Sequence, residues 1–249
     1  MTTKPVVLIH GVSDSHRGWD AVVAELGTHG SDLKTITYDL RGHGGAPTRP
    51  LVTSIDDFVD DLVALLDGRG VAAAHIVGFS LGGLIAQRVA VREPARVTTL
   101  TVIGSVAGRT EDESARALDR LHAIETLGPV GVAEQSITRW YTSEQLAADP
   151  AVSERVIAKM EALDAEAYAA AYRVLATTDL ADDLHRIVAP TLAITGEYDI
   201  GSPPHMTELI AARTGGIAVI IPGAKHSVLQ DHAPLIAKEI LTHVHRDQL

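Results

Sequence analysis

The chain has 249 residues with 32 acidic and 21 basic side chains, a formal net charge of −11, and no cysteine. Without cysteine it has no disulfide scaffold, thiolate metal site, iron–sulfur cluster or cysteine nucleophile. Its negative charge argues against a nucleic-acid or anionic-membrane binder. Its hydrophobic content of 46% with 21% charged residues is that of a globular chain.

Short apolar runs rich in β-branched residues recur along the chain and predict strands. Their near-continuous hydrophobicity indicates strands that are buried on both faces, as in a parallel sheet with helical crossovers. These runs are Val6–His10, Thr35–Asp39, His75–Phe79, Val97–Ile103, Thr191–Thr195 and Ile217–Ile221.

Between the strands, apolar residues at helical spacing predict the crossovers. The predicted helices are Trp19–Leu26, Ile55–Leu66, Leu81–Val91, Pro204–Ala212 and Ala233–Val244. Ser54 followed three residues later by Asp57 resembles an N-cap signal at the start of the second helix. The alternation of strand and helix predicts an α/β fold with six strands.

One interval, residues 107–184, contains no strand-like run and is rich in alanine. It is far longer than an ordinary connection, so we expect an inserted helical subdomain on a core formed by residues 1–106 and 185–249. Breakers at Gly128-Pro129 and Pro150 divide it into about four helices. Because ligands of open parallel sheets bind outside the carboxyl ends of the strands, we interpret the insertion as a lid. The alternative is a helical domain with no role in the site.

No targeting segment is visible, because the apolar run after Met1–Pro5 is too short for a signal-peptide core. No uncharged apolar stretch is long enough to span a bilayer. The expectation is a cytoplasmic protein without nucleic-acid or membrane partners.

The most specific motif is Gly78-Phe79-Ser80-Leu81-Gly82, at the junction of a predicted strand and a predicted helix. A serine in this sharp turn has a strained backbone, which is tolerated where the flanking positions lack side chains. The turn lifts the hydroxyl above the sheet, close to the free N–H groups of the helix N-terminus. Ser80 is therefore the predicted nucleophile. A phosphate-binding loop is disfavoured, because neither a lysine before the helix nor a G-x-G-x-x-G pattern is present.

A serine nucleophile needs a histidine base and an orienting acid. His226 follows the last strand, in a loop expected on the same side of the sheet as Ser80. Two carboxylates, Glu197 and Asp199, follow the fifth strand. We prefer Asp199, which lies deeper in its loop, and keep Glu197 as the alternative. The order Ser80, Asp199, His226 is the one expected of an α/β-hydrolase.

Acyl transfer also needs an oxyanion hole. The backbone N–H of Leu81, directly after the nucleophile, is one expected donor. The backbone N–H of Val12, in the loop after the first strand, is the other.

These motifs, together with His10-Gly11 and Tyr38–Gly44, resemble the α/β-hydrolase superfamily over most of the chain. Within it the sequence is most similar to the 3-oxoadipate enol-lactonase-like branch, through Arg139-Trp140-Tyr141 and the proline-rich loop after Asp199. The resemblance implies hydrolysis through an acyl-enzyme, with a small anionic lactone as substrate in the enol-lactonases. The two antiparallel N-terminal strands usual in the family are missing, so a reduced, mostly parallel sheet of six strands is expected.

The predicted function is hydrolysis of a small ester or lactone by a Ser-His-Asp triad, without cofactor or metal. The expected pocket residues are mostly aromatic: Trp19, Phe79, Trp140, Tyr141 and Tyr168. Arg139 either pairs with a substrate carboxylate or is a solvated charge on the lid. The alternatives are a cofactor-free haloperoxidase or perhydrolase, a carbon–carbon, amide or carbamate hydrolase, and, in another class, a hydrolase-like receptor or regulatory binding protein.

Overall fold

The computed structural model describes residues 4–28 and 33–246. These residues form one six-stranded sheet with the order β2-β1-β3-β4-β5-β6, in which every neighbouring pair is parallel. The strands are β1 (Val6–Ile9), β2 (Thr35–Thr37), β3 (Ala74–Phe79), β4 (Val97–Ile103), β5 (Thr191–Gly196) and β6 (Ile217–Ile221). The six-stranded α/β architecture predicted from the sequence is confirmed.

Burial follows the position of each strand in the sheet. β1, β3 and β5 are buried along their whole length, as the continuous apolar runs predict. The prediction of burial on both faces is wrong for the two edge strands: Thr35 and Thr37 of β2 are only half-buried, and Ile217 of β6 is 42% exposed. β6 lies at the edge of the sheet, so it has one neighbouring strand and less cover.

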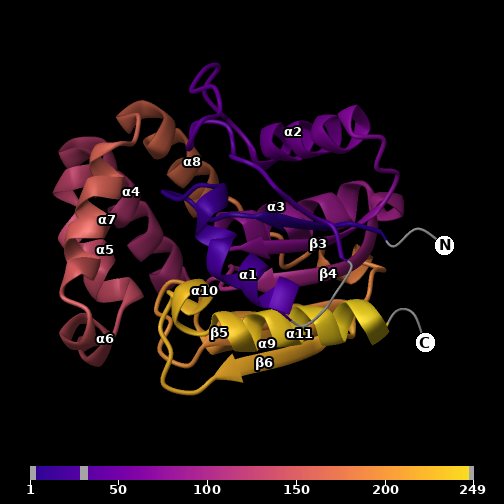
Figure 1. The fold of residues 1–249 in the computed structure, drawn as a ribbon. Helices are drawn as coiled ribbons and strands as arrows, with labels where there is room; N and C mark the ends of the chain where they lie inside the picture. Colours follow the sequence, from indigo (N-terminus) through magenta and orange to yellow (C-terminus); the bar gives the residue numbers. More distant parts are fainter. Residues whose placement is uncertain (1–3, 29–32, 247–249) are drawn as a thin grey trace.

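Helices cover both faces of the sheet (Figure 1). One face packs against α2 (Ile55–Gly68), α3 (Leu81–Arg92) and α9 (Pro204–Thr214), through a core cluster that includes Phe58, Leu84 and Ile210. The other face packs against α1 (Asp20–Thr28), α10 (Val228–Asp231) and α11 (Ala233–Arg246). Short 3₁₀ turns are η1 (His16–Trp19), η2 (Pro94–Arg96) and η3 (Leu184–Arg186).

Between β4 and β5 the chain forms five helices, which we call the lid helices. They are α4 (Glu111–Gly131), α5 (Ala133–Trp140), α6 (Ser143–Ala148), α7 (Ala151–Glu161) and α8 (Ala165–Thr177), and they gather at one end of the molecule (Figure 1). The sequence predicted about four, and neither the break after Trp140 nor the break after Glu161 carries a proline or a glycine that would mark it. Gly128, with φ 70°, kinks α4 close to its end.

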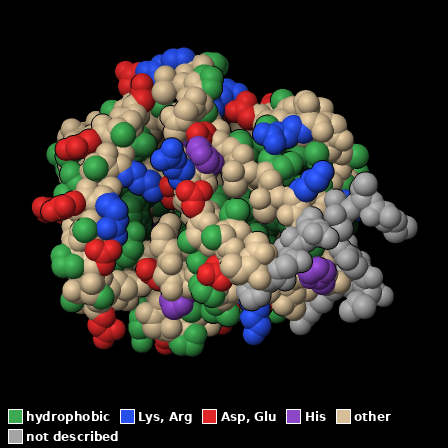
Figure 2. All heavy atoms as spheres, viewed as in Figure 1, with side chains coloured by type: hydrophobic (Ala, Val, Ile, Leu, Met, Phe, Trp, Pro, Cys, Tyr) green, Lys and Arg blue, Asp and Glu red, His purple; other side chains and the backbone are tan. Residues whose placement is uncertain are grey.

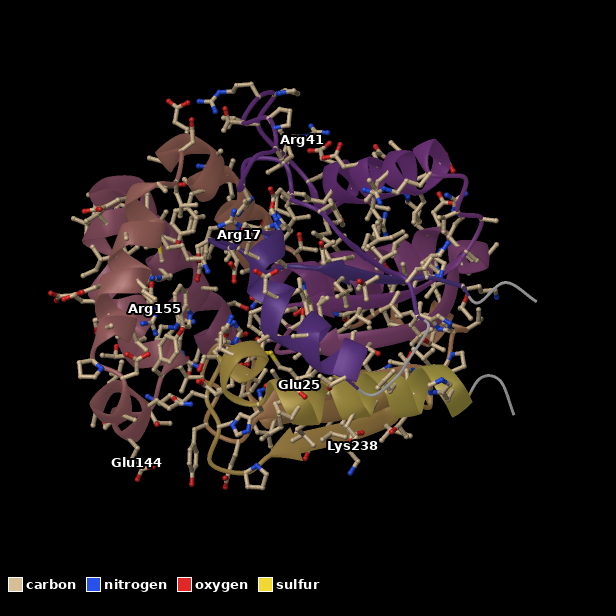
Figure 3. The ribbon with its side chains drawn as sticks, in the orientation of Figure 1. Arg17, Glu25, Arg41, Glu144, Arg155 and Lys238 are labelled. Atoms are coloured by element: carbon tan, nitrogen blue, oxygen red, sulfur yellow. The ribbon has the colours of Figure 1, made fainter. Side chains whose placement is uncertain are left out.

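The lid helices are anchored to different degrees. Ala171 and Val174 of α8 belong to the main core cluster, so this helix is part of the scaffold. Helices α5 and α7 instead share a small cluster of their own, which includes Ile137, Val156 and Met160. Glu144 of α6 points away from the protein (Figure 3). The part of the lid formed by α5–α7 therefore has a separate hydrophobic core.

Positive and negative side chains are interspersed on the face of the molecule shown in Figure 2. Among the residues that the structure describes, no helix is both long enough and apolar enough to cross a membrane.

Candidate active site

Ser80 stands in the turn between β3 and α3 with a strained backbone, φ 54° and ψ −116°. Few residues other than glycine adopt a positive φ, so this conformation must be held by its surroundings. The two flanking glycines permit the turn. A Cβ on Gly78 would lie 2.0 Å from the carbonyl oxygen of Gly82, and a Cβ on Gly82 would lie 2.2 Å from that of Ile9. Side chains at these positions would push the strand and the helix apart.

His226 and Asp199 are hydrogen-bonded to each other, with 2.6 Å between Nδ1 and Oδ2. The Asp199 side chain is almost fully buried and accepts further hydrogen bonds at Oδ1 from the backbone N–H groups of Gly201 (2.8 Å) and Ser202 (3.0 Å). The acid is thus fixed by its own loop. It holds the imidazole with Nδ1 facing the carboxylate, which leaves Nε2 available for a reacting group.

Glu197, the alternative acid, is used differently. Its Oε2 accepts a hydrogen bond from the backbone N–H of Gly223 at 2.8 Å. This bond ties the loop after β5 to the loop after β6, and Asp199 is the carboxylate that reaches His226.

A cavity of about 570 Å³ opens between the core and the lid helices. Ser80, Asp199 and His226 all line it. Phe79 packs beside the histidine, with 4.9 Å between the ring centroids. The lid closes the other side through residues of α4, α5, α7 and α8. A small molecule in this cavity would therefore contact both the predicted triad and the lid.

The loop after β1 runs directly past the serine. A Cβ on Gly11 would lie 3.1 Å from the Cβ of Ser80 and from a ring carbon of Phe79, so a side chain here would crowd the nucleophile. Val12, a predicted oxyanion donor, lines the cavity, and Ser13 has a positive φ of 64°. Leu81, the other predicted donor, begins α3, and an N–H in the first turn of a helix has no partner within the helix.

His10 connects this loop to the chain after β2 through hydrogen bonds of its ring. It is fully buried, its Nε2 accepts a hydrogen bond from the backbone N–H of Leu40 at 3.0 Å, and its Nδ1 lies 2.8 Å from the carbonyl oxygen of Gly11. These partners require a neutral ring with the proton on Nδ1. Burial lowers the pKa of His10 to about 3, with a further contribution from His43, whose ring lies 5.4 Å away.

Most of the predicted pocket residues line the cavity, namely Phe79, Arg139, Trp140, Tyr141 and Tyr168. Burial raises the pKa of both Tyr141 and Tyr168 to about 12, and their protonated hydroxyl groups can donate hydrogen bonds.

The structure does not bring Trp19 to the cavity. It is fully buried at the end of η1, in the core cluster on the face of the sheet covered by α1, α10 and α11, which also contains Val6 and Leu8. The chain turns away from the site after the β1 loop, since α1 must cover that face. The prediction that Trp19 lines the pocket, which rested on its position in sequence close to the β1 loop, is therefore wrong.

Sequence reasoning missed several charged residues of the cavity, and Arg120 of α4 is the most buried of its arginines. A signal was present. Arg120 lies at helical spacing from Ala117 and Ile124, within the apolar face of α4. A charged residue on the buried face of a helix is uncommon unless it has a specific partner.

Acidic and histidine side chains can bind metal ions when three or more of them lie close together. Among residues 4–28 and 33–246, no group of three such side chains could hold a metal ion.

Comparison with known proteins places the chain in a family. The model of the alpha/beta hydrolase family matches residues 6–239, almost the whole chain. The chain belongs to the alpha/beta hydrolase family. This hydrolase thus combines the family's sheet with a cavity that contains a serine, a histidine and an aspartate.

Two relatives from Acinetobacter baylyi are hydrolases. The (E)-2-((N-methylformamido)methylene)succinate hydrolase is 29% identical over 228 residues, 90% of this chain and 84% of that protein. The 3-oxoadipate enol-lactonase 1 is 29% identical over 194 residues, 78% of this chain and 71% of that protein. Among solved structures, an enol-lactonase from Burkholderia xenovorans has a TM-score of 0.89 at 24% identity, covering 98% of this chain and 92% of that one. That last similarity concerns the fold.

Proposed function

We propose that this protein is a serine hydrolase that cleaves a small ester or lactone through an acyl-enzyme. The observation that carries the proposal is the hydrogen bond of 2.6 Å between His226 and Asp199, in a cavity that also contains the strained Ser80. Each of the three side chains follows a different strand of the sheet, at the edge that faces the lid helices.

The chemistry follows from this arrangement. The Oγ of Ser80 attacks the carbonyl carbon while Nε2 of His226 accepts the hydroxyl proton, and Asp199 stabilises the imidazolium that forms. The negative charge on the tetrahedral oxygen is stabilised by the backbone N–H groups of Val12 and Leu81. When the intermediate collapses, His226 returns the proton to the leaving oxygen. Water, activated by the same histidine, then hydrolyses the acyl-enzyme.

The proposed substrate is an ester or lactone that also carries a carboxylate group. Support comes from the names of the two relatives, which contain succinate and 3-oxoadipate, both dicarboxylates. Arg139 lines the cavity as a positive group, and a guanidinium can bind a carboxylate through two hydrogen bonds.

The proposal is tested by turnover of p-nitrophenyl acetate. The wild-type protein is expected to release many equivalents of p-nitrophenolate, and Ser80→Ala is expected to lower kcat by roughly 10⁴-fold or more. The matched control is Ser143→Ala, an exposed serine in α6 that does not line the cavity, and it is expected to leave turnover unchanged. A single stoichiometric burst across a panel of esters and lactones, or unchanged turnover in Ser80→Ala, would contradict the proposal.

A further inference from the structure

Arg120 is a buried arginine whose guanidinium is held in place by neutral groups. Only 8% of the residue is exposed. Its Nη1 donates to Oε1 of Gln135 at 2.8 Å, and its Nη2 donates to the carbonyl oxygen of Val132 at 3.2 Å and to Oγ of Ser136. These partners lie in or beside α5 and fix the orientation of the guanidinium. Because all three are uncharged, they do not neutralise its positive charge.

No carboxylate balances this charge. Within residues 4–28 and 33–246, no acidic side chain lies within 4.0 Å of the guanidinium nitrogens of Arg120. Burial lowers the pKa of Arg120, and the nearby positive charge of Arg139 lowers it further, yet an arginine keeps its proton at neutral pH. A buried charge without a counter-ion is costly, which points to a partner that the chain itself does not supply.

The acidic residues of the cavity are mostly engaged elsewhere. Asp14 pairs with Lys159 at 2.6 Å, Glu113 lies 2.8 Å from His205, and Asp199 contacts His226. The remaining one, Asp119, is exposed and adjacent to Arg120 in sequence, and successive residues of a helix point in different directions. The cavity therefore has positive charge left over beside Arg120.

Arg139 brings a second positive group to the same cavity. A Cβ on Gly201 would lie 3.0 Å from Nη2 of Arg139, so this guanidinium lies against the loop that carries Asp199. In the described part of the chain, Arg139 has no ion-pair partner either. Arg120 and Arg139 are close enough for the charge of one to lower the pKa of the other. An anion bound beside both would relieve this repulsion.

We infer that Arg120, together with Arg139, forms an anion subsite that binds a carboxylate group of the substrate, with Arg120 as the residue that determines specificity for it. This inference rests on the proposed function for the identity of the site as a substrate cavity. A carboxylate offers acceptors to both guanidinium groups, whereas a neutral substituent would leave the buried charge of Arg120 uncompensated.

The inference is tested first by binding, which does not require catalysis. Glutarate carries a carboxylate at each end, and glutaramide is its neutral analogue of similar size. In titration calorimetry with the wild-type protein, glutarate is expected to bind at least tenfold more tightly than glutaramide. Arg120→Met and Arg139→Met are each expected to weaken glutarate binding by tenfold or more. Glutarate should also inhibit hydrolysis of p-nitrophenyl acetate competitively.

Arg173→Met is the matched control, because Arg173 is an exposed lid arginine on α8 that pairs with Glu125 and does not line the cavity. Its glutarate affinity is expected to stay within twofold of wild type. Arg120→Lys keeps the charge but loses the planar fork, so an intermediate affinity is expected. If Arg120→Met fails to fold, Arg120→Lys, Arg139→Met and the wild-type comparison of the two ligands still decide the matter.

Three results would overturn the inference. Glutarate could bind the wild type no better than glutaramide. Arg120→Met and Arg139→Met could both bind glutarate like the wild type. Arg120→Met could lower the thermal stability and the hydrolysis of neutral esters while leaving glutarate affinity intact, which would make Arg120 only a structural link between α4 and α5. Absence of ester turnover with glutarate binding preserved would instead contradict the proposed function and leave the subsite standing.

Discussion

At the scale of single residues, Asp199 carries two separable tasks. Its Oδ1 organises the loop through the N–H groups of Gly201 and Ser202, and its Oδ2 orients His226. An asparagine at this position keeps one carbonyl oxygen for the loop but replaces the second acceptor by an N–H donor. The substitution therefore separates loop structure from orientation of the imidazole.

We predict that Asp199→Asn lowers kcat by roughly 10³–10⁴-fold while KM changes only a few-fold, because the histidine loses its correct tautomer. Steady-state kinetics on one neutral ester, with a thermal melt to confirm folding, measure this. Glu197→Gln is the control and is expected to stay within a few-fold of wild type, since Glu197 bonds to the backbone of Gly223. The opposite ranking of the two variants would show that Glu197 is the orienting acid.

At the scale of elements, the sequence predicted what local chemistry determines. The strands were visible because continuous apolar runs reflect burial in a parallel sheet. The turn at Ser80 was visible because a Cβ on Gly78 or Gly82 would lie only about 2 Å from a backbone oxygen, so both positions need glycine. The choice of Asp199 also followed from position in a loop, and the structure brings that residue to His226.

Features that depend on tertiary packing could not be predicted from the sequence. Trp19 follows the β1 loop in sequence, but η1 buries it in the core cluster on the face of the sheet covered by α1. The break between α5 and α6 has no glycine or proline, and it is marked only by Thr142, which caps α6 together with Gln145. Arg120 was missed because its proposed role depends on which side chains surround it in three dimensions. The spacing of residues in the sequence does not show that it lacks a neighbouring carboxylate.

At the scale of the whole molecule, two neutral histidines are buried under the active-site loop. Burial lowers the pKa of His10 to about 3 and also lowers the pKa of His43. In the unfolded chain both rings titrate near the ordinary value of 6.5. As the pH falls below 6.5, the unfolded state takes up protons that the folded state refuses, so the free energy of unfolding decreases.

We predict that the contribution of His10 to stability is complete above pH 6.5 and is lost progressively as the pH falls toward 3. One such group gives a slope of about 1.4 kcal/mol per pH unit over most of this range. Urea unfolding at pH 7, 6 and 5 measures it, with His10→Gln expected to show a slope smaller by about that amount. The raised pKa of Asp231 acts in the opposite direction but is common to both proteins. Equal slopes in the two proteins would contradict the prediction.

The central claim, that Ser80 is an activated nucleophile, is tested most directly by covalent labelling with paraoxon followed by mass spectrometry of the intact protein and its peptides. The cavity also contains other serines that serve as internal controls, namely Ser13, Ser105, Ser202 and Ser227. The account predicts one diethylphosphoryl group per chain, on Ser80, with loss of esterase activity in proportion and no labelling of Ser80→Ala. Labelling of another serine, or full activity in a protein labelled at Ser80, would contradict it.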